Sequence, residues 1–321
     1  MSKGARIWFI IGVALVILGG MLFSAALLSG DWNFEKLSSD NYVTNTYEID
    51  EETVSISVIA DTADIVFLKS DDGKARVICY ESENVKHSVS ITSGVLNISF
   101  KDNRKWYEHI SLASRTPKIT VYLPKEQYSS LVIENDTGNI EIPKDFRFWL
   151  IDVETNTGDV KNYASASDSV KIKASTGDIT TEDISAATVE LSVSTGMIYA
   201  EKIFCSGDIK IDVSTGRTTL NNVSCKNLVS TGNTGDISLN NVVLEEKLYI
   251  ERTTGDVSFD DCDAAEIIIK TDTGSVKGSL RSEKIFIVNT DTGRVNVPKT
   301  TSGGKCEITT DTGDISITVN G

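Results

Sequence analysis

In the last two thirds of this 321-residue chain, ten Thr-Gly steps follow one another at intervals of 19 or 20 residues. A fixed period of this length is typical of repeat proteins, in which each unit is the same supersecondary piece and packs on its neighbours. The sequence therefore predicts an elongated rod. The ten glycines are Gly138, Gly158, Gly177, Gly196, Gly216, Gly235, Gly255, Gly274, Gly293 and Gly313.

Each repeat has the pattern of strand, turn, strand, turn. A short polar residue always stands two places before the glycine, and such residues together with glycine are typical of tight turns. Upstream, alternation such as Val189, Leu191 and Val193 has the period of a strand with one buried face. When the repeats are aligned, two further positions form columns of residues that we expect to face the core. The residue two places after the glycine is apolar except at Thr218. The residue seven places after it is Ile184, Ile203, Val223, Val242 and Cys262 in successive repeats.

These columns predict closed coils that each add one strand to each of two parallel sheets. Stacked at about 4.8 Å, ten coils would extend for about 50 Å. We therefore expect residues 126–321 to form a right-handed parallel β-solenoid of about ten 19–20-residue coils, because parallel crossovers are almost always right-handed. The alternative is a long antiparallel meander with Thr-Gly at alternate turns, which the period alone does not exclude.

The N-terminus has the composition of a membrane span. No charged residue occurs from Ile7 to Leu28, and 22 helical residues at about 1.5 Å each cover about 33 Å. Lys3 and Arg6 precede this stretch, so the positive-inside rule places residues 1–6 in the cytoplasm and the rest of the chain outside, as a single-pass protein of the cell membrane. A cleaved signal peptide is the alternative, but the apolar stretch 7–28 is longer than a usual signal.

Between the predicted span and the regular repeats, residues 29–45 have the polar composition of a stalk and residues 46–125 are rich in irregular strands. The segment Asp61-Thr-Ala-Asp-Ile65 resembles a degenerate Thr-Gly-Asp-Ile unit, so we expect 46–125 to form a β-rich cap with degenerate coils. The last repeat ends at Gly321 with nothing after it. We therefore expect an open C-terminal edge that pairs with a second copy or with a partner strand.

The net charge and the spacing of the cysteines argue against some classes of partner and of metal site. With 46 acidic and 31 basic residues the net charge is −15, which disfavours nucleic acid as a partner. The five cysteines have no CxxC spacing and so predict no zinc site. Cys205 and Cys225 each lie nine residues after a repeat glycine and would stack on adjacent coils, either as a disulfide or as buried thiols.

No motif predicts catalysis. The chain has two histidines, His87 and His109, both outside the repeats, and no known catalytic or nucleotide-binding fingerprint. Aspartates directly after the repeat glycines form an interrupted column, which we interpret as turn residues and not as a calcium site. We therefore predict a protein that is not an enzyme, with no catalytic residues, cofactor or metal.

One segment has the composition of a binding surface. Aromatic and basic side chains are typical anchors of interfaces, and in this acidic chain they gather between residues 101 and 115. An alternative is that Trp106 closes the end of the core. The candidate partner-binding residues are Arg104, Lys105, Trp106, Tyr107 and His109.

The segment Ile119-Thr-Val121-Tyr-Leu123-Pro124-Lys125, followed by Leu131-Val-Ile133 and serial Thr-Gly-Asp-Ile/Val units, resembles the bacterial putative-adhesin family of β-strand repeats, a domain family of unknown function. The resemblance covers roughly residues 50–321 and implies a membrane-anchored or exported solenoid, with no catalytic residues. Some members accompany cell-envelope stress systems.

Together with the residue patterns, this predicts a non-enzymatic, adhesin-like, extracytoplasmic binding or scaffold protein of the cell envelope. Its partner would be an envelope protein or glycan. The alternatives are an envelope-stress sensing partner of a membrane signalling system and a glycan-active β-helix enzyme.

Overall fold

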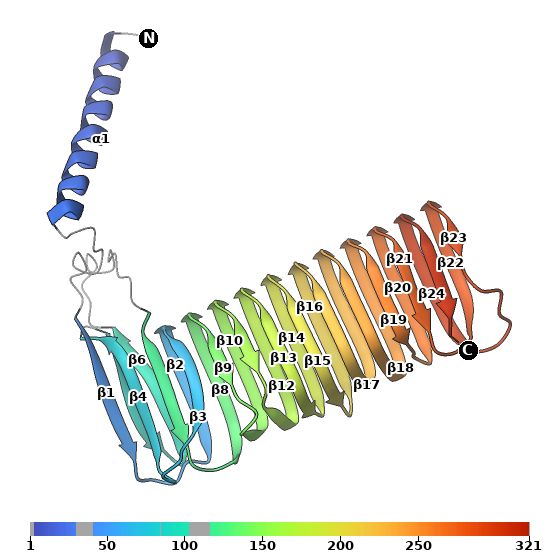
Figure 1. The fold of residues 1–321 in the computed structure, drawn as a ribbon, viewed down its shortest axis with the longest axis horizontal. Coiled ribbons are helices and arrows are strands. Elements are labelled where there is room, and N and C mark those ends of the chain that lie inside the picture. The colour runs from blue at the N-terminus through green and yellow to red at the C-terminus, as the bar shows by residue number, and fades with distance from the viewer. Residues whose placement is uncertain (1–2, 30–40, 84, 103–115, 321) are drawn as a thin grey trace.

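The computed structural model describes residues 3–29, 41–83, 85–102 and 116–320 (Figure 1). A single helix, α1 (Lys3–Ser29), precedes a long β-solenoid whose coils stack along one axis. The Thr-Gly steps turn the chain from one face of the solenoid to the other. The β-solenoid predicted from the repeat period is confirmed.

Two sheets, which we call wall 1 and wall 2, enclose the core. In spatial order, wall 1 consists of β5 (Val85–Thr92), β6 (Val95–Asp102), β2 (Ser55–Thr62), β8 (Gln127–Thr137), β10 (Arg147–Thr157), β12 (Ser165–Thr176), β14 (Thr188–Thr195), β16 (Asp208–Thr215), the second halves of β17 (Thr218–Thr234) and β18 (Ile237–Thr254), β20 (Glu266–Thr273), β24 (Gly304–Thr312) and β22 (Lys284–Thr292).

Wall 2 follows the same axis. In spatial order it consists of β1 (Tyr42–Ile49), β4 (Ala75–Ser82), β7 (Lys118–Leu123), β3 (Asp64–Lys69), β9 (Ile140–Ile142), β11 (Val160–Asn162), β13 (Ile179–Ala186), β15 (Ile198–Cys205), the first halves of β17 and β18, β19 (Val257–Cys262), β21 (Val276–Leu280), β25 (Ile315–Val319) and β23 (Val295–Asn296).

The coils pair in parallel. Equivalent residues face each other, as Val170 faces Val189 and Ile179 faces Ile198. Within the described residues, antiparallel pairing between these strands is confined to β1 with β4, β4 with β7, and β5 with β6. The antiparallel meander is therefore excluded for the repeats.

The repeat glycines form a ladder in which each lies against a backbone carbonyl oxygen of the adjacent coil. Gly216 has a φ of +143°, and a Cβ added to it would lie 1.8 Å from the carbonyl oxygen of Gly196. A Cβ on Gly158 would lie 2.1 Å from the carbonyl oxygen of Gly138. Since no side chain fits so close to a backbone oxygen and positive φ is unfavourable for L-residues, the turn requires glycine for two separate reasons.

Both predicted inward columns lie in the core. The residue two places after the glycine is buried at most repeats, including the exceptional Thr218. The residues seven places after the glycine, from Ile184 to Cys262, are also buried. Val295 is 46% exposed because it lies in the last coil of the stack. Cys205 and Cys225 are free, buried thiols.

The aspartates after the repeat glycines bond to the neighbouring coil. Oδ1 of Asp159 accepts a hydrogen bond from the backbone N–H of Asp178 (2.9 Å), and Oδ1 of Asp178 accepts one from Met197 (2.7 Å). Oδ1 of Asp256 accepts one from Ser275 (2.7 Å). These carboxylates satisfy turn N–H groups that would otherwise lack a partner, so we assign them to the structure of the turn.

The order of coils at the C-terminal end differs from the order in the sequence. β24 lies between β20 and β22 along its length, and the first two residues of β25, Ile315 and Ser316, lie between β21 and β23, so the last repeat of the chain is not the last coil of the stack. The expectation that the C-terminal repeat forms the open edge is wrong. The strands at the open end are β22 and β23.

Two local features allow this insertion. Gly304 begins β24, and a Cβ there would lie 2.0 Å from the carbonyl oxygen of Ala265, so only glycine fits between the neighbouring coils. Lys284, which pairs with Gly304, places its Nζ 2.6 Å from Oδ1 of Asp263 and is almost fully buried. β23 ends at Asn296, and Pro298, which follows it in the chain, has no N–H to donate to a further strand.

The glycine ladder predicts the effect of a single methyl group. Gly216→Ala should reduce the free energy of unfolding by about 3–5 kcal/mol, because it adds both φ strain and overlap with Gly196. Gly73→Ala is the matched control: Gly73 also has positive φ, but a Cβ there meets no atom within 4 Å, so we expect about 1–2 kcal/mol. Equal losses in denaturant titrations would show that the close contact has no energetic role.

Because alternate residues of a strand face the core, adjacent residues should differ in how well they tolerate a charge. Ile237 is fully buried, so Ile237→Asp should destabilise the solenoid by about 4 kcal/mol or more through an unpaired buried charge. Ser238 faces outward and is partly exposed, so Ser238→Asp should cost about 0.5 kcal/mol or less. The same thermal and chemical denaturation measurements compare the two variants, and equal tolerance would contradict the register.

Candidate functional site

The segment that the sequence singled out for binding lies outside the described residues. Arg104, Lys105, Trp106, Tyr107 and His109 all fall between β6 and β7, in residues 103–115. Their role as partner-binding residues stays a prediction.

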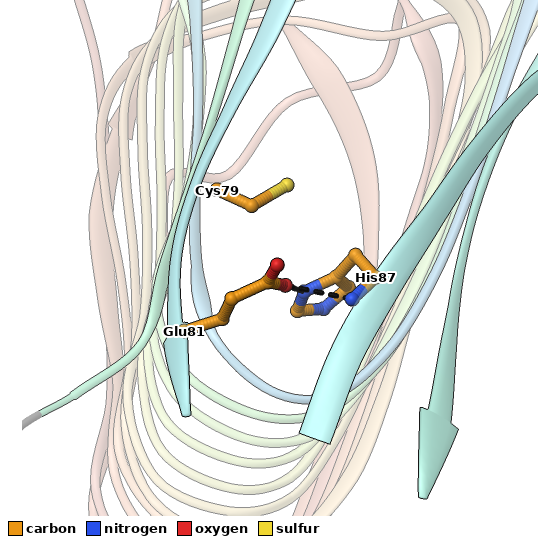
Figure 2. A group of neighbouring side chains, drawn as sticks. All are labelled: Cys79, Glu81 and His87. Atoms are coloured by element: carbon orange, nitrogen blue, oxygen red, sulfur yellow. Dashed lines mark hydrogen bonds and ion pairs between the residues drawn. The ribbon is translucent and has the colours of Figure 1, made fainter. Parts of the chain in front are cut away.

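A buried polar cluster lies inside the N-terminal part of the solenoid. Cys79 and Glu81 lie two residues apart on β4 of wall 2, and His87 lies on β5 of wall 1. Figure 2 shows the Glu81 and His87 side chains pointing toward each other, with Cys79 beside Glu81. All three are buried, and one ligand atom from each lies within 4.8 Å of the others.

Hydrogen bonds hold this cluster in place. Oε2 of Glu81 lies 2.6 Å from Nδ1 of His87 and 2.6 Å from its backbone N, and Oε1 accepts a bond from Nδ2 of Asn45 on β1 (2.6 Å). The hydroxyl of Tyr47 donates to the carbonyl of His87 (2.9 Å). The carboxylate thus links β4 to β5 and β1, and a buried carboxylate needs such donors to remain in the core.

The chemistry of the cluster favours a structural role. Burial, and to a lesser extent the nearby Glu81, raises the pKa of the Cys79 thiol to about 12, so the thiol stays protonated at neutral pH and is a poor nucleophile. Nδ1 of His87 and both oxygens of Glu81 are engaged in hydrogen bonds. We interpret the cluster as the polar link that closes the N-terminal end of the core.

Two buried cations in the repeats were not foreseen from the sequence. Lys284 forms the buried contact with Asp263 described above. Arg252 is 3% exposed, and its guanidinium donates to Oγ of Ser230 (2.8 Å) and to the carbonyl of Glu251 (2.9 Å). Burial lowers the pKa of Arg252 to about 10. Arg252 is accommodated because Gly232 on the adjacent strand has no side chain.

The described surface also has a groove, at the second corner of four successive coils. Two small residues, Ser165 and Ser185, are among those that line it. Phe204 also lines it and is 61% exposed, whereas the equivalent outward position in the preceding coil is Ser185. Tyr163 is a second aromatic lining residue. We call this the corner groove.

The charge of the corner groove differs from that of the whole chain. Three basic side chains line it, Lys144, Arg147 and Lys202, against one acidic residue, Asp183. The net charge of the protein is −15, so this excess of cations is local. Cations beside exposed aromatic rings are suited to anionic or ring-containing ligands, since guanidinium and ammonium groups bind anions and aromatic faces stack on flat surfaces.

The sequence contained only a weak signal for this groove. Lys144, Tyr163 and Phe204 stand at corners where the repeat pattern is least regular, and each alone is compatible with an ordinary solvent-exposed position. The groove results from the stacking of four coils, which brings these residues to one edge of the solenoid.

Several solved structures have a similar fold. They include a putative adhesin from Bacteroides fragilis (14% identity, TM-score 0.42, covering 88% of this chain and 98% of that one) and a putative adhesin from Parabacteroides merdae (11%, 0.48, 75% and 97%). A putative lipid binding protein from Parabacteroides distasonis is also similar (14%, 0.29, 88% and 98%). At these identities no function is carried over to this chain.

A comparison with curated proteins gives no match. The family model for the Toastrack DUF4097 domain matches residues 53–206 and 203–321, which together span the solenoid. The resemblance noted from the Thr-Gly-Asp-Ile units is in agreement with this match. The chain belongs to the Toastrack DUF4097 family.

Proposed function

We propose that this protein is a non-enzymatic, adhesin-like binding and scaffold protein of the bacterial cell envelope. The corner groove is the observation that carries the proposal, because it offers aromatic and basic side chains for a ligand. Within the described residues, the Cys79, Glu81 and His87 side chains lie inside the core, and Glu81 is hydrogen-bonded to His87, which suits support of the fold better than turnover. The partner is an envelope protein or glycan.

The N-terminal helix supports an anchored location. Gly4–Ala25 has a mean hydropathy of 2.5, and no residue of this stretch is buried against the solenoid. An apolar helix without a protein partner needs a lipid environment, and its length matches a bilayer core. We propose that α1 stays attached as a single-pass anchor, with Lys3 and Arg6 in the cytoplasm and the solenoid outside.

Two surfaces are proposed to contact the partner. The corner groove is one of them. The segment that carries Arg104, Lys105, Trp106, Tyr107 and His109 is the second, on the basis of its sequence alone. Both combine basic and aromatic residues in an acidic protein, and both would therefore favour an anionic region of an envelope partner.

The anchored orientation predicts which residues a membrane-impermeant maleimide reaches in intact, wall-stripped cells. The native cysteines are buried, so they give little background. Asn240→Cys, at an exposed position of the solenoid, should be labelled without lysis, whereas Ser2→Cys should be labelled only after permeabilisation. Labelling of Asn240→Cys only after lysis would contradict the orientation, and loss of the N-terminal residues from the mature chain would contradict the anchor.

Binding to protein-free bacterial cell wall tests the corner groove. The combined Arg147→Ala and Phe204→Ala variant should raise the dissociation constant about tenfold or more, because aromatic and arginine anchors carry much of the binding energy. Its melting temperature should not change, since both side chains are exposed.

Met197→Ala is the matched control, because Met197 is an exposed apolar residue at the Thr-Gly corner of the same coil as Phe204. The Trp106→Ala and Tyr107→Ala pair tests the second surface in the same assay. Unchanged binding in the groove variant with loss in the Trp106 and Tyr107 variant would move the site to residues 104–109. Unchanged binding in both would refute a wall glycan as the partner.

A further inference from the structure

The C-terminal end of the solenoid has two strands with an unpaired edge. Within the described residues, β22 pairs with β24 on one side and β23 pairs with β25 on one side, and neither has a partner on the other. Figure 1 shows β22 and β23 at the end of the rod farthest from β1. Inward-facing Phe286 and Val288 are only partly buried there, because no coil covers them.

The β22 part of this edge lacks the charges and prolines that normally prevent pairing, whereas β23 is short and is followed by Pro298. The stretch from Ile285 to Thr290 contains no charged residue and no proline. Ile285 and Ile287 face outward and are 45% and 54% exposed. The one lysine of β22, Lys284, is turned inward toward Asp263 and so does not shield the edge. An exposed, uncharged, apolar edge strand is a template for a further strand.

The adjacent strand β24 is charged at the same positions. Ile285 and Ile287 pair with Lys305 and Glu307 of β24, whose side chains form an ion pair at 2.6 Å. At the opposite end of wall 1, β5 presents exposed polar residues at its outward positions, among them Lys86 and Ser88. The two exposed isoleucines therefore distinguish β22 from β24 and from the terminal strand at the other end.

The two walls restrict what can cover this end. A single extended peptide would pair with β22 or with β23, and would leave the other strand and half of the core exposed. A second copy of this chain presents two strands at the same separation. A two-fold rotation across the end places β22 antiparallel to β22 of the partner and β23 antiparallel to β23 of the partner, and it brings identical apolar faces together without opposing charges.

We propose that two copies of this chain join end to end through β22 and β23, forming a two-fold symmetric dimer whose core is continuous across the junction. The interface is isologous and uses the C-terminal end of each copy, so this contact joins two copies and no more. The contact does not involve the corner groove, which lies near the middle of the rod and stays available to a partner. The dimer thus carries two binding surfaces.

Sedimentation velocity of the full chain in detergent micelles tests the dimer. The unmodified chain should be dimeric at micromolar concentrations. Ile287→Lys places like charges across the two-fold axis and should raise the dissociation constant about 100-fold. Its melting temperature, measured at a concentration where both chains are monomeric, should be unchanged because Ile287 is exposed. Phe204→Lys is the matched control: it adds the same charge at an exposed apolar position in the middle of the rod, and it should leave the dimer intact.

A second measurement separates this contact from association through α1. Single cysteines at Ile285, Ile287 and Asn289, all on the outward face of β22, should give disulfide-linked dimers on mild oxidation, whereas Asn240→Cys should not. Dimers that persist in Ile287→Lys and give no cross-link on β22 would overturn the proposal in favour of another interface. A full chain that is monomeric at 100 μM, a concentration about 100 times a micromolar dissociation constant, would also overturn it.

Discussion

The contact between each repeat glycine and a backbone carbonyl oxygen of the adjacent coil determines the rest of the architecture. A Cβ at these positions would lie about 2 Å from a backbone oxygen, so the chain can turn at this corner only where it has glycine. Because the contact recurs every coil, it fixes the register of both walls at once. Inward columns then align, and their apolar side chains form one core cluster that continues from coil to coil.

In this arrangement, different residues determine the stability of the fold and the binding surface. The Thr-Gly corner and the inward columns are constrained in every coil, whereas the second corner needs a residue with positive φ, such as Asp183 or Lys202, followed by a buried residue, such as Ile184 or Ile203. Outward-facing side chains beside these two positions can vary at little cost to the fold. The corner groove lies there, and the change from Ser185 to Phe204 between adjacent coils illustrates how a stack of similar repeats acquires a local binding surface.

The repeat period predicted the solenoid, the two walls and both inward columns, because these follow from the spacing of glycine and apolar residues. It did not predict the order of coils at the C-terminal end. Repeats with nearly the same sequence can pair with several neighbours, and the choice made here depends on Gly304 and on the contact of Lys284 with Asp263. The Cys79, Glu81 and His87 cluster was not predicted either, since antiparallel strands of the irregular region bring it together.

Hydrogen exchange followed by mass spectrometry tests this order of coils, and with it the identity of the open end, most directly. At a concentration where the chain is monomeric, amides of Gly304–Thr312 should be strongly protected because β24 pairs with β20 on one side and with β22 on the other. Amides in Lys284–Thr292 should exchange faster, and should become protected as the concentration rises. Fast exchange in Gly304–Thr312 with protection of Lys284–Thr292 in the monomer would show that the repeats stack in the order of the sequence.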